Sequence, residues 1–216
     1  MKKGGRYDAS GLIEAQFEPG SRGRVLRNLL EIKKKRVMDQ VEQREQFRAI
    51  EELIRLYDQE HRFTAADVCK IHKTWLGPIY VWAGQYRQVN ISKGDFPFAA
   101  AGQISRLMSD FENGPLRDFT PCRFRSTEEI AKAIAIVHTE LILVHPFREG
   151  NGRVARLLAN LMALQAGLPL LDFTGFKGRK RQIYFTAVQA GMDRDYRPMQ
   201  EVFTVIIDKS LRTLRQ

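Results

Sequence analysis

The spacing of apolar residues along the chain predicts a mostly helical protein. The clearest pattern begins at Ser126, where Ser126 and Glu129 form a capping box, a reciprocal pairing of side chain and backbone at a helix start. Apolar residues then recur every three or four positions until Pro146, at Ile130, Ile134, Val137 and Leu141. A second strongly apolar stretch, from about Arg153 to Gln165 and closed by Gly167, predicts another core helix.

Weaker patterns predict further helices on both sides of this pair. Thr64 and Asp67 form an N-terminal capping signal, and the helix that follows them stops at Gly77-Pro78. One further helix is expected to start near Val25, and another to run through 38–58 with apolar residues at Val41, Phe47, Ile50, Ile54 and Tyr57. A helix after the hairpin segment carries Ile104, Leu107, Met108 and Phe111 on one side. A last helix is expected to span about 198–212, with Val202, Val205, Ile206 and Leu211 buried.

Residues 86–98 follow the period of two that is typical of strands. Val89 and Ile91 alternate with polar residues, Lys93-Gly94-Asp95 supplies a turn, and Phe96 and Phe98 alternate again. The pattern predicts a short two-stranded hairpin, which must lean on the helices because an isolated hairpin is marginally stable. The expected fold class is therefore all-α with a small hairpin. Residues 1–24, rich in glycine and arginine, are expected to be irregular, and residues 25–216 to form one domain.

Composition narrows the class of protein. The 216 residues are 44% apolar, which is ordinary for a globular protein, and contain no apolar run near the roughly 20 residues of a membrane span. The basic N-terminus has no apolar segment behind it and so does not resemble a secretory signal. Cys69 and Cys122 lack the spacing of a disulfide scaffold or a zinc site, so the expected location is the reducing cytoplasm.

The formal net charge of +10 is the one unusual bulk property. Much of it comes from two clusters: Arg22, Arg24, Arg27 and Lys33 to Arg36, then Lys177 and Arg179 to Arg181. Such charge attracts polyanions, which include nucleotides, nucleic acids and acidic proteins, although each cluster is equally well interpreted as a solvated surface. No zinc-finger spacing or aromatic RNA-binding motif accompanies it. A nucleic-acid-binding module therefore stays an alternative rather than the favoured interpretation.

Candidate chemistry lies between the two strongest helices, in the segment His145-Pro-Phe-Arg-Glu-Gly-Asn-Gly-Arg153. His145 follows Leu141 by four residues and should point inward from the end of a buried helix. On its own such a histidine is usually a core residue bonded to a carbonyl. Gly150-Asn151-Gly152, however, forms a small turn directly before a helix, where free N–H groups and the helix dipole attract phosphates.

The charged neighbours of this turn strengthen the phosphate interpretation. Arg153 and Arg156 lie three residues apart and so share one face of the helix. Two guanidinium groups beside free N–H groups suit a polyphosphate. Glu149 adds one carboxylate, and one carboxylate plus phosphate oxygens is a common way to hold Mg²⁺. Because the chain contains no G-x-x-x-x-G-K-[ST] motif, it is not a P-loop protein.

The same segment resembles the signature HPFx[DE]GN[GK]R of the Fic family and matches it at every defined position; Arg156 falls on the family's second arginine. Tyr80-Val-Trp82-Ala-Gly84-Gln-Tyr-Arg87, followed by Asn90 to Gly94 and Phe98, resembles the family's hairpin, called the flap. Glu18-Pro19-Gly20 and Val25 to Asn28 resemble the leading segment of many bacterial Fic toxins, with Glu31 at a position where glycine is usual. The resemblance covers about residues 18–205.

The resemblance implies a Fic fold, which is a helical bundle with a hairpin flap, and a protein adenylyltransferase. Such an enzyme moves AMP from ATP to a Tyr, Thr or Ser hydroxyl of a target protein and releases pyrophosphate. It implies His145 as general base, Glu149 as Mg²⁺ ligand, and phosphate or ATP contacts from Lys93, Gly94, Gly150, Asn151 with its side chain, Gly152, Arg153 and Arg156. It implies adenine contacts from Tyr184 and Phe185 and target docking by Ile91, Ser92 and Phe98, whereas Phe147 is expected to pack in the core.

Alternatives within the family are transfer of UMP, phosphate or phosphocholine, and a catalytically silent scaffold. The kinase-like relatives carry Ala and Lys where this chain has Gly150 and Gly152, which favours AMP. Fic enzymes are commonly restrained by a segment [ST]-x-x-x-E-[GN] whose glutamate pairs with the second arginine. The nearest match, Ser10 to Glu14, is followed by Ala15. The favoured hypothesis is that a small, separate antitoxin supplies this glutamate to a toxin with a basic surface.

Overall fold

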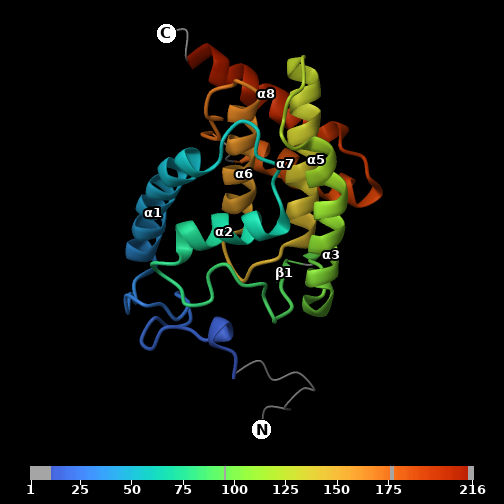
Figure 1. Ribbon diagram of the computed structural model, residues 1–216. Helices are drawn as coiled ribbons and strands as arrows, with labels where there is room; N and C mark the ends of the chain where they lie inside the picture. Colours follow the sequence, from blue (N-terminus) through green and yellow to red (C-terminus); the bar gives the residue numbers. More distant parts are fainter. Residues whose placement is uncertain (1–10, 95, 176–177, 214–216) are drawn as a thin grey trace.

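Two helices from the middle of the chain, α5 (Thr127–Val144) and α6 (Asn151–Gln165), lie side by side at the centre of the molecule (Figure 1). The computed structural model describes residues 11–94, 96–175 and 178–213. Nearly every residue of α5 from Ile130 to Val144 is buried, as expected for a helix that is apolar on all sides. The capping box of Ser126 and Glu129, predicted from the sequence, is present.

The other elements surround this pair. In chain order they are η1 (Ile13–Ala15), α1 (Lys35–Leu56), α2 (Ala65–Leu76), β1 (Ser92–Lys93), β2 (Phe96–Pro97), η2 (Ala101–Gln103), α3 (Ile104–Phe111), the π-helical turn η3 (Glu112–Leu116), α4 (Arg117–Phe119), α5, α6, α7 (Arg179–Ala190), η4 (Gly191–Asp193) and α8 (Arg197–Thr213). The helical bundle and the small hairpin confirm the predicted fold class. Within the described ranges, no helix combines the length and apolar composition that a membrane crossing requires.

The packing places α8 and α6 against α5, and α1 and α2 against each other beside α6 (Figure 1). The helix α2 begins with the predicted capping box of Thr64 and Asp67 and buries Val68, Ile71, His72, Trp75 and Leu76. The hairpin pairs Ser92 with Pro97 and Lys93 with Phe96 in antiparallel register. It is shorter than the alternating pattern suggested, because only the residues next to the turn form a ladder.

The helix predicted near Val25 is absent, and residues 16–34 are irregular. An isolated bridge joins Phe17 to Leu26, and the Asn28 side chain holds the loop by bonds to backbone groups of Leu26, Leu30 and Ile32. Glu31 has a φ of 53°, in the left-handed region where glycine is favoured. This conformation explains why glycine is usual at this position in the resembling family.

The predicted apolar faces of two helices were only partly wrong, since Val41, Ile50 and Tyr57, and then Val202, Ile206 and Leu211, do pack on the core. On α1, Phe47 is 64% exposed and Ile54 39% exposed, and the buried residues are Met38, Glu42, Ala49 and Leu53. On α8, Val205 is 60% exposed, whereas Phe203 and Ile207, absent from the predicted stripe, are buried. The helix α7 was not predicted at all, since only Ala187 and Val188 of its residues are buried and it shows no apolar stripe.

Candidate active site

The loop after α5 is built around one buried asparagine. His145 ends the helix in the left-handed conformation, with φ 52° and ψ 58°. Asn151, the first residue of α6, accepts a hydrogen bond from Phe147 N at 2.8 Å and donates one to Phe147 O at 2.7 Å. Both ends of its side-chain amide are therefore used inside the loop. The sequence analysis expected the side chain of Asn151 to contact phosphate as well, but only its backbone N–H remains available to a ligand.

His72 supports the same loop from α2, a role that the sequence analysis missed. Its ring stacks on Phe147 at 3.9 Å between centroids, and Phe147 is fully buried, as predicted. Nδ1 accepts from Gly84 N at 2.7 Å, so Nε2 carries the proton and donates to Glu149 O at 3.1 Å. Burial lowers the pKa of His72 to about 4, so this imidazole is neutral at pH 7.

The N-terminus of α6 begins at a position that only glycine can occupy. Gly150 has a φ of +85°, and a Cβ there would lie 2.7 Å from the Trp75 ring. The backbone N–H groups of Asn151 and Gly152, in the first turn, have no acceptor among the described residues. Free N–H groups at a helix start, together with the helix dipole, are features that attract an anion.

His145 has the geometry of a general base. Its Nδ1 lies 3.0 Å from the Ile142 carbonyl, and because a carbonyl only accepts, Nδ1 carries the proton and Nε2 is unprotonated. The Phe98 ring stacks on the imidazole at 3.5 Å between centroids. Burial, and then the charges of Arg87 and Lys93, lower the pKa of His145 to about 4. The ring is therefore neutral, and able to take a proton, throughout the physiological pH range.

The two arginines of α6 have different surroundings. Arg153 Nη1 lies 2.7 Å from the buried carboxylate of Glu42 on α1, and its guanidinium lies over the Trp75 ring at 4.4 Å. Arg156 donates from Nε to Gly152 O at 3.0 Å and has no carboxylate within 4.0 Å among the described residues. The charge of Arg153 is thus largely compensated by the protein, and that of Arg156 is not.

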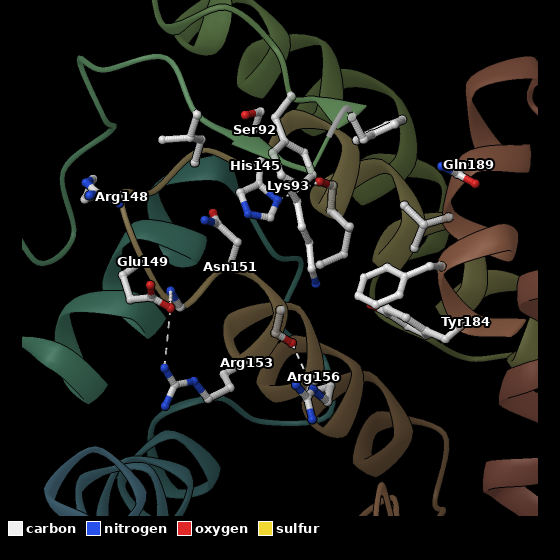
Figure 2. Close-up of a pocket in the computed structure, with 18 of the residues that line it drawn as sticks. Ser92, Lys93, His145, Arg148, Glu149, Asn151, Arg153, Arg156, Tyr184 and Gln189 are labelled. Atoms are coloured by element: carbon white, nitrogen blue, oxygen red, sulfur yellow. Dashed lines mark hydrogen bonds and ion pairs between the residues drawn. The ribbon is translucent and has the colours of Figure 1, made fainter. Parts of the chain in front are cut away.

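These groups line one cavity of about 790 Å³. Figure 2 shows His145, Glu149, Asn151, Arg153 and Arg156 around it, with Lys93 reaching in from the flap and Tyr184 on the opposite wall. Every predicted site residue lines the cavity except Gly94, which lies at the tip of the hairpin. Its lining also includes residues that the sequence analysis had not assigned: Phe96, Ile142, Arg148, Gln182, Val188 and Gln189.

The wall of the cavity that α7 forms combines aromatic rings with polar groups. Lys93 Nζ lies 3.7 Å from the centroid of the Phe185 ring, so the flap and α7 touch across the cavity. The Tyr184 hydroxyl is 2.8 Å from Nε2 of the buried His138. The apolar rings together with the amides of Gln182 and Gln189 are the kind of surface that binds a nucleobase.

The flap presents a free backbone edge beside the histidine. Phe98 N donates to Ile91 O at 3.2 Å, which closes the hairpin at its base. Ser92 and Lys93 are exposed, and β1 pairs only with β2 within the described residues. An exposed strand edge of this kind can add a strand from another protein.

Glu149 is the one carboxylate that lines the cavity within the described residues. Its Oε1 accepts from Gly150 N at 3.0 Å and lies 3.6 Å from Arg153 Nη2. The described residues contain no group of three or more His, Cys, Asp or Glu side chains arranged to hold a metal. A hard cation that shares its coordination between one carboxylate, water and a phosphate ligand fits this donor set.

Comparisons with known proteins agree on one family. The model of the Fic/DOC family matches residues 62–163. The probable protein adenylyltransferase Fic of Escherichia coli K12 is 29% identical over 145 residues, which cover 65% of this chain and 68% of that protein. The protein adenylyltransferase Fic of Aedes aegypti is also 29% identical, over 74% of this chain but only 30% of its own length. The chain thus spans less than a third of the insect relative.

Solved structures show the same fold. The N-terminal Fic domain of a putative cell filamentation protein from Bartonella quintana, solved with bound ADP, is 28% identical with a TM-score of 0.66, over 84% of this chain and 89% of that one. The N-terminal Fic domain of Bep8 from Bartonella sp. 1-1C is 21% identical with a TM-score of 0.69, over 85% and 90% of the two chains.

Proposed function

The chain belongs to the Fic/DOC family, and we propose that it is a protein adenylyltransferase, which transfers AMP from ATP to a hydroxyl side chain of a target protein. The observation that carries the proposal is the single cavity in which a neutral histidine, free N–H groups at a helix start and an uncompensated arginine meet. Its volume of about 790 Å³ suits a nucleotide.

In the proposed reaction, Nε2 of His145 takes the proton from the target hydroxyl. The hydroxyl oxygen attacks the α-phosphorus of ATP, the bond from this phosphorus to the oxygen that bridges the α- and β-phosphates breaks, and pyrophosphate leaves. The hydrogen bond from Nδ1 to Ile142 O holds the ring in the required tautomer and stabilises the imidazolium that forms.

The protein would stabilise the phosphates by fixed electrostatics. The N–H groups of Asn151 and Gly152 point from the start of α6, and Arg156 brings a positive charge that no carboxylate of the described residues neutralises. Positioning and preorganised charge are the main sources of rate in phosphoryl-type transfers. Arg153 would contribute less charge, because Glu42 already pairs with it.

A divalent cation would complete the site. Mg²⁺ suits a single carboxylate together with phosphate oxygens, and Glu149, which lines the cavity, would hold it. When bound, the ion would neutralise charge on the phosphates of ATP.

The flap and α7 would select the two substrates. Ile91, Ser92 and Phe98 would dock a segment of the target along the free edge of β1, beside His145. Tyr184 and Phe185 would contact the base of the nucleotide, and Lys93, which lies against Phe185, would close the cavity between them.

Transfer is tested by incubating the purified chain and a cell lysate with ATP that is labelled on either the α- or the γ-phosphate, with and without Mg²⁺. Protein label from α-labelled ATP alone, present only with Mg²⁺ and absent for His145→Ala, supports AMP transfer. Label from γ-labelled ATP would instead identify a kinase. His145→Ala should still bind ATP within a few-fold, since the residue contacts the hydroxyl and not the phosphates.

We further propose that a separate small, acidic antitoxin restrains the enzyme and that the chain acts as a toxin. Arg156, the expected partner of an inhibitory glutamate, has no such partner within the described residues. Glu14 is buried elsewhere: its carboxylate accepts from Gln88 N at 2.6 Å, and its carbonyl accepts from Arg148 Nε at 3.0 Å. Ser10, the first residue of the candidate inhibitory segment, lies outside the described residues.

Two variants distinguish the sources of inhibition. If a separate protein supplies the glutamate, Glu14→Gly changes AMP transfer little and Arg156→Ala abolishes it. A large gain of transfer by Glu14→Gly would show that the chain's own N-terminal segment is the inhibitor and would overturn the antitoxin proposal.

A further inference from the structure

Arg87 is a fully buried arginine whose side chain bonds only to backbone carbonyls. Its exposed fraction is 1%. Nε donates to His145 O at 2.8 Å, Nη1 to Val89 O at 2.7 Å, and Nη2 to Ala99 O at 2.5 Å. Its backbone N–H donates to Pro146 O at 2.8 Å. No carboxylate lies within ion-pair distance of it among the described residues.

The three carbonyls belong to the two parts of the site that must work together. Val89 and Ala99 lie at the two ends of the hairpin, just outside the Ile91–Phe98 hydrogen bond that closes it. His145 carries the base and has a left-handed backbone, which is costly for a residue with a side chain. One guanidinium therefore joins both ends of the flap to the backbone of the base.

Burying a charge without a carboxylate partner is costly unless hydrogen bonds replace the lost water. Arginine meets this condition here because its planar group donates in three fixed directions, one to each carbonyl. A lysine in the same place could not reproduce the fork. The chemistry of the residue is thus matched to holding three segments in one arrangement, which apolar packing would do less specifically.

We propose that Arg87 is a positioning residue that docks the flap against His145, so that a target hydroxyl held by the flap meets Nε2. The stacking of Phe98 on the imidazole at 3.5 Å is the contact that this docking maintains. The inference rests on the proposed function only for the role of the flap in holding a target; the docking itself can be measured without substrate.

The test compares Arg87→Lys with Arg62→Lys. Arg62 is the control because it also donates to a backbone carbonyl, that of Arg117, but is exposed and lies outside the cavity. Hydrogen exchange is followed in the absence of ligand at Phe98 N, which closes the hairpin. Exchange at this amide should speed up by on the order of tenfold in Arg87→Lys and stay unchanged in Arg62→Lys.

The kinetic arm uses a protein target identified by the labelling experiment. In Arg87→Lys we expect kcat/KM for the target to fall by on the order of tenfold to a hundredfold, because the hydroxyl is misplaced. The dissociation constant of ATP should stay within about twofold, since no contact of Arg87 reaches the start of α6. Equal losses for target and ATP would indicate a general structural role and overturn the proposal.

Arg87→Gln is the second variant, in case the lysine variant does not fold. Glutamine is neutral, so it carries no buried charge, and it can keep a bond to one carbonyl. Faster exchange at Phe98 N in the folded variant supports the proposal, and unchanged exchange overturns it. If the parent chain transfers no AMP, the proposed function fails, while the exchange data still decide whether Arg87 docks the flap.

Discussion

The imidazole of His145 is kept neutral by its surroundings. The Phe98 ring covers one face, the Ile142 carbonyl fixes the tautomer, and the nearby cations Arg87 and Lys93 oppose protonation. A lower pKa makes a weaker base, but it keeps nearly all of the histidine in the deprotonated form at neutral pH. The acid limit of the enzyme, which is the pH below which His145 becomes protonated and stops working as a base, is therefore set by these individual contacts.

Removal of the Phe98 ring should move that limit. In Phe98→Ala the imidazole gains solvent, so its pKa should rise from about 4 toward the ordinary 6.5. Since the base works only when deprotonated, the loss of the self-modification rate on the acid side should begin about one to two pH units higher, on the order of the relieved shift. The measurement is the pH profile of self-modification. Phe96→Ala, which removes a ring that contacts Phe98, is the control and should keep the parent acid limit; an unmoved limit in Phe98→Ala would contradict the assigned cause.

Two elements are held to the site by contacts that a single helix or hairpin cannot supply. The flap has a ladder of two residue pairs, too few to be stable alone, and leans on His145 and Phe185. On the other side, α1 reaches α6 through the buried Glu42, which also accepts from the Tyr80 hydroxyl at 2.8 Å.

The flap should matter more for a separate target than for self-modification. Ile91→Asp removes part of the apolar grip on a docked strand, whereas an acceptor on the same chain is already at high effective concentration. We expect target modification to fall on the order of tenfold and self-modification to change by less than about threefold. Val81→Asp, at a 52% exposed position outside the cavity, is the matched control. Equal losses in both assays would leave the hairpin a structural role only.

The ion pair between α1 and α6 should contribute to stability far more than surface pairs on the same helix. Glu42→Ala leaves Arg153, 27% exposed, without its main partner, and breaking such a buried pair costs about 3 kcal/mol. Glu52→Ala, which breaks an exposed pair with Arg48, should cost less than about 1 kcal/mol. Urea unfolding of both variants measures the difference, and similar costs would show that Glu42 is replaceable by packing alone.

Over the whole molecule, three of the four histidines are held neutral. Burial lowers the pKa of His72 and His145 to about 4 and that of His138 to about 3. In the unfolded chain each takes up a proton near pH 6.5. Their contribution to stability is therefore complete above about pH 6.5 and is lost as the pH falls toward the folded values.

The free energy of unfolding should consequently decrease between pH 6.5 and pH 5, a window above most carboxylate titrations. The expected slope approaches about 1.4 kcal/mol per pH unit for each histidine. His138→Gln keeps an amide donor near the Tyr184 hydroxyl and removes one titrating group. Its slope should be smaller than that of the parent by about one proton. A slope that does not change would mean that His138 titrates normally in the folded protein.

Short-range sequence patterns were sufficient to predict several parts of the structure. The capping boxes at Thr64 and Ser126 and the apolar stripe of α5 each depend on residues within one short segment. They could be predicted because the interactions that form them lie inside the segment. The gathering of the predicted residues around one cavity followed from the loop and from the family resemblance.

Only the tertiary structure decided which face of α1 is buried and what α7, Arg87 and Glu42 do. Glu42 can lie on the buried face because its carboxylate pairs with Arg153, 111 residues later, and accepts a hydrogen bond from Tyr80. The pattern of residues within α1 does not predict these partners. Nothing near Arg87 in the sequence marks it as buried, because two of its three carbonyls, those of Ala99 and His145, come from other segments. A buried polar group is stable only with its partners in place, so its position follows from the assembly of the elements rather than from the periodicity of any one of them.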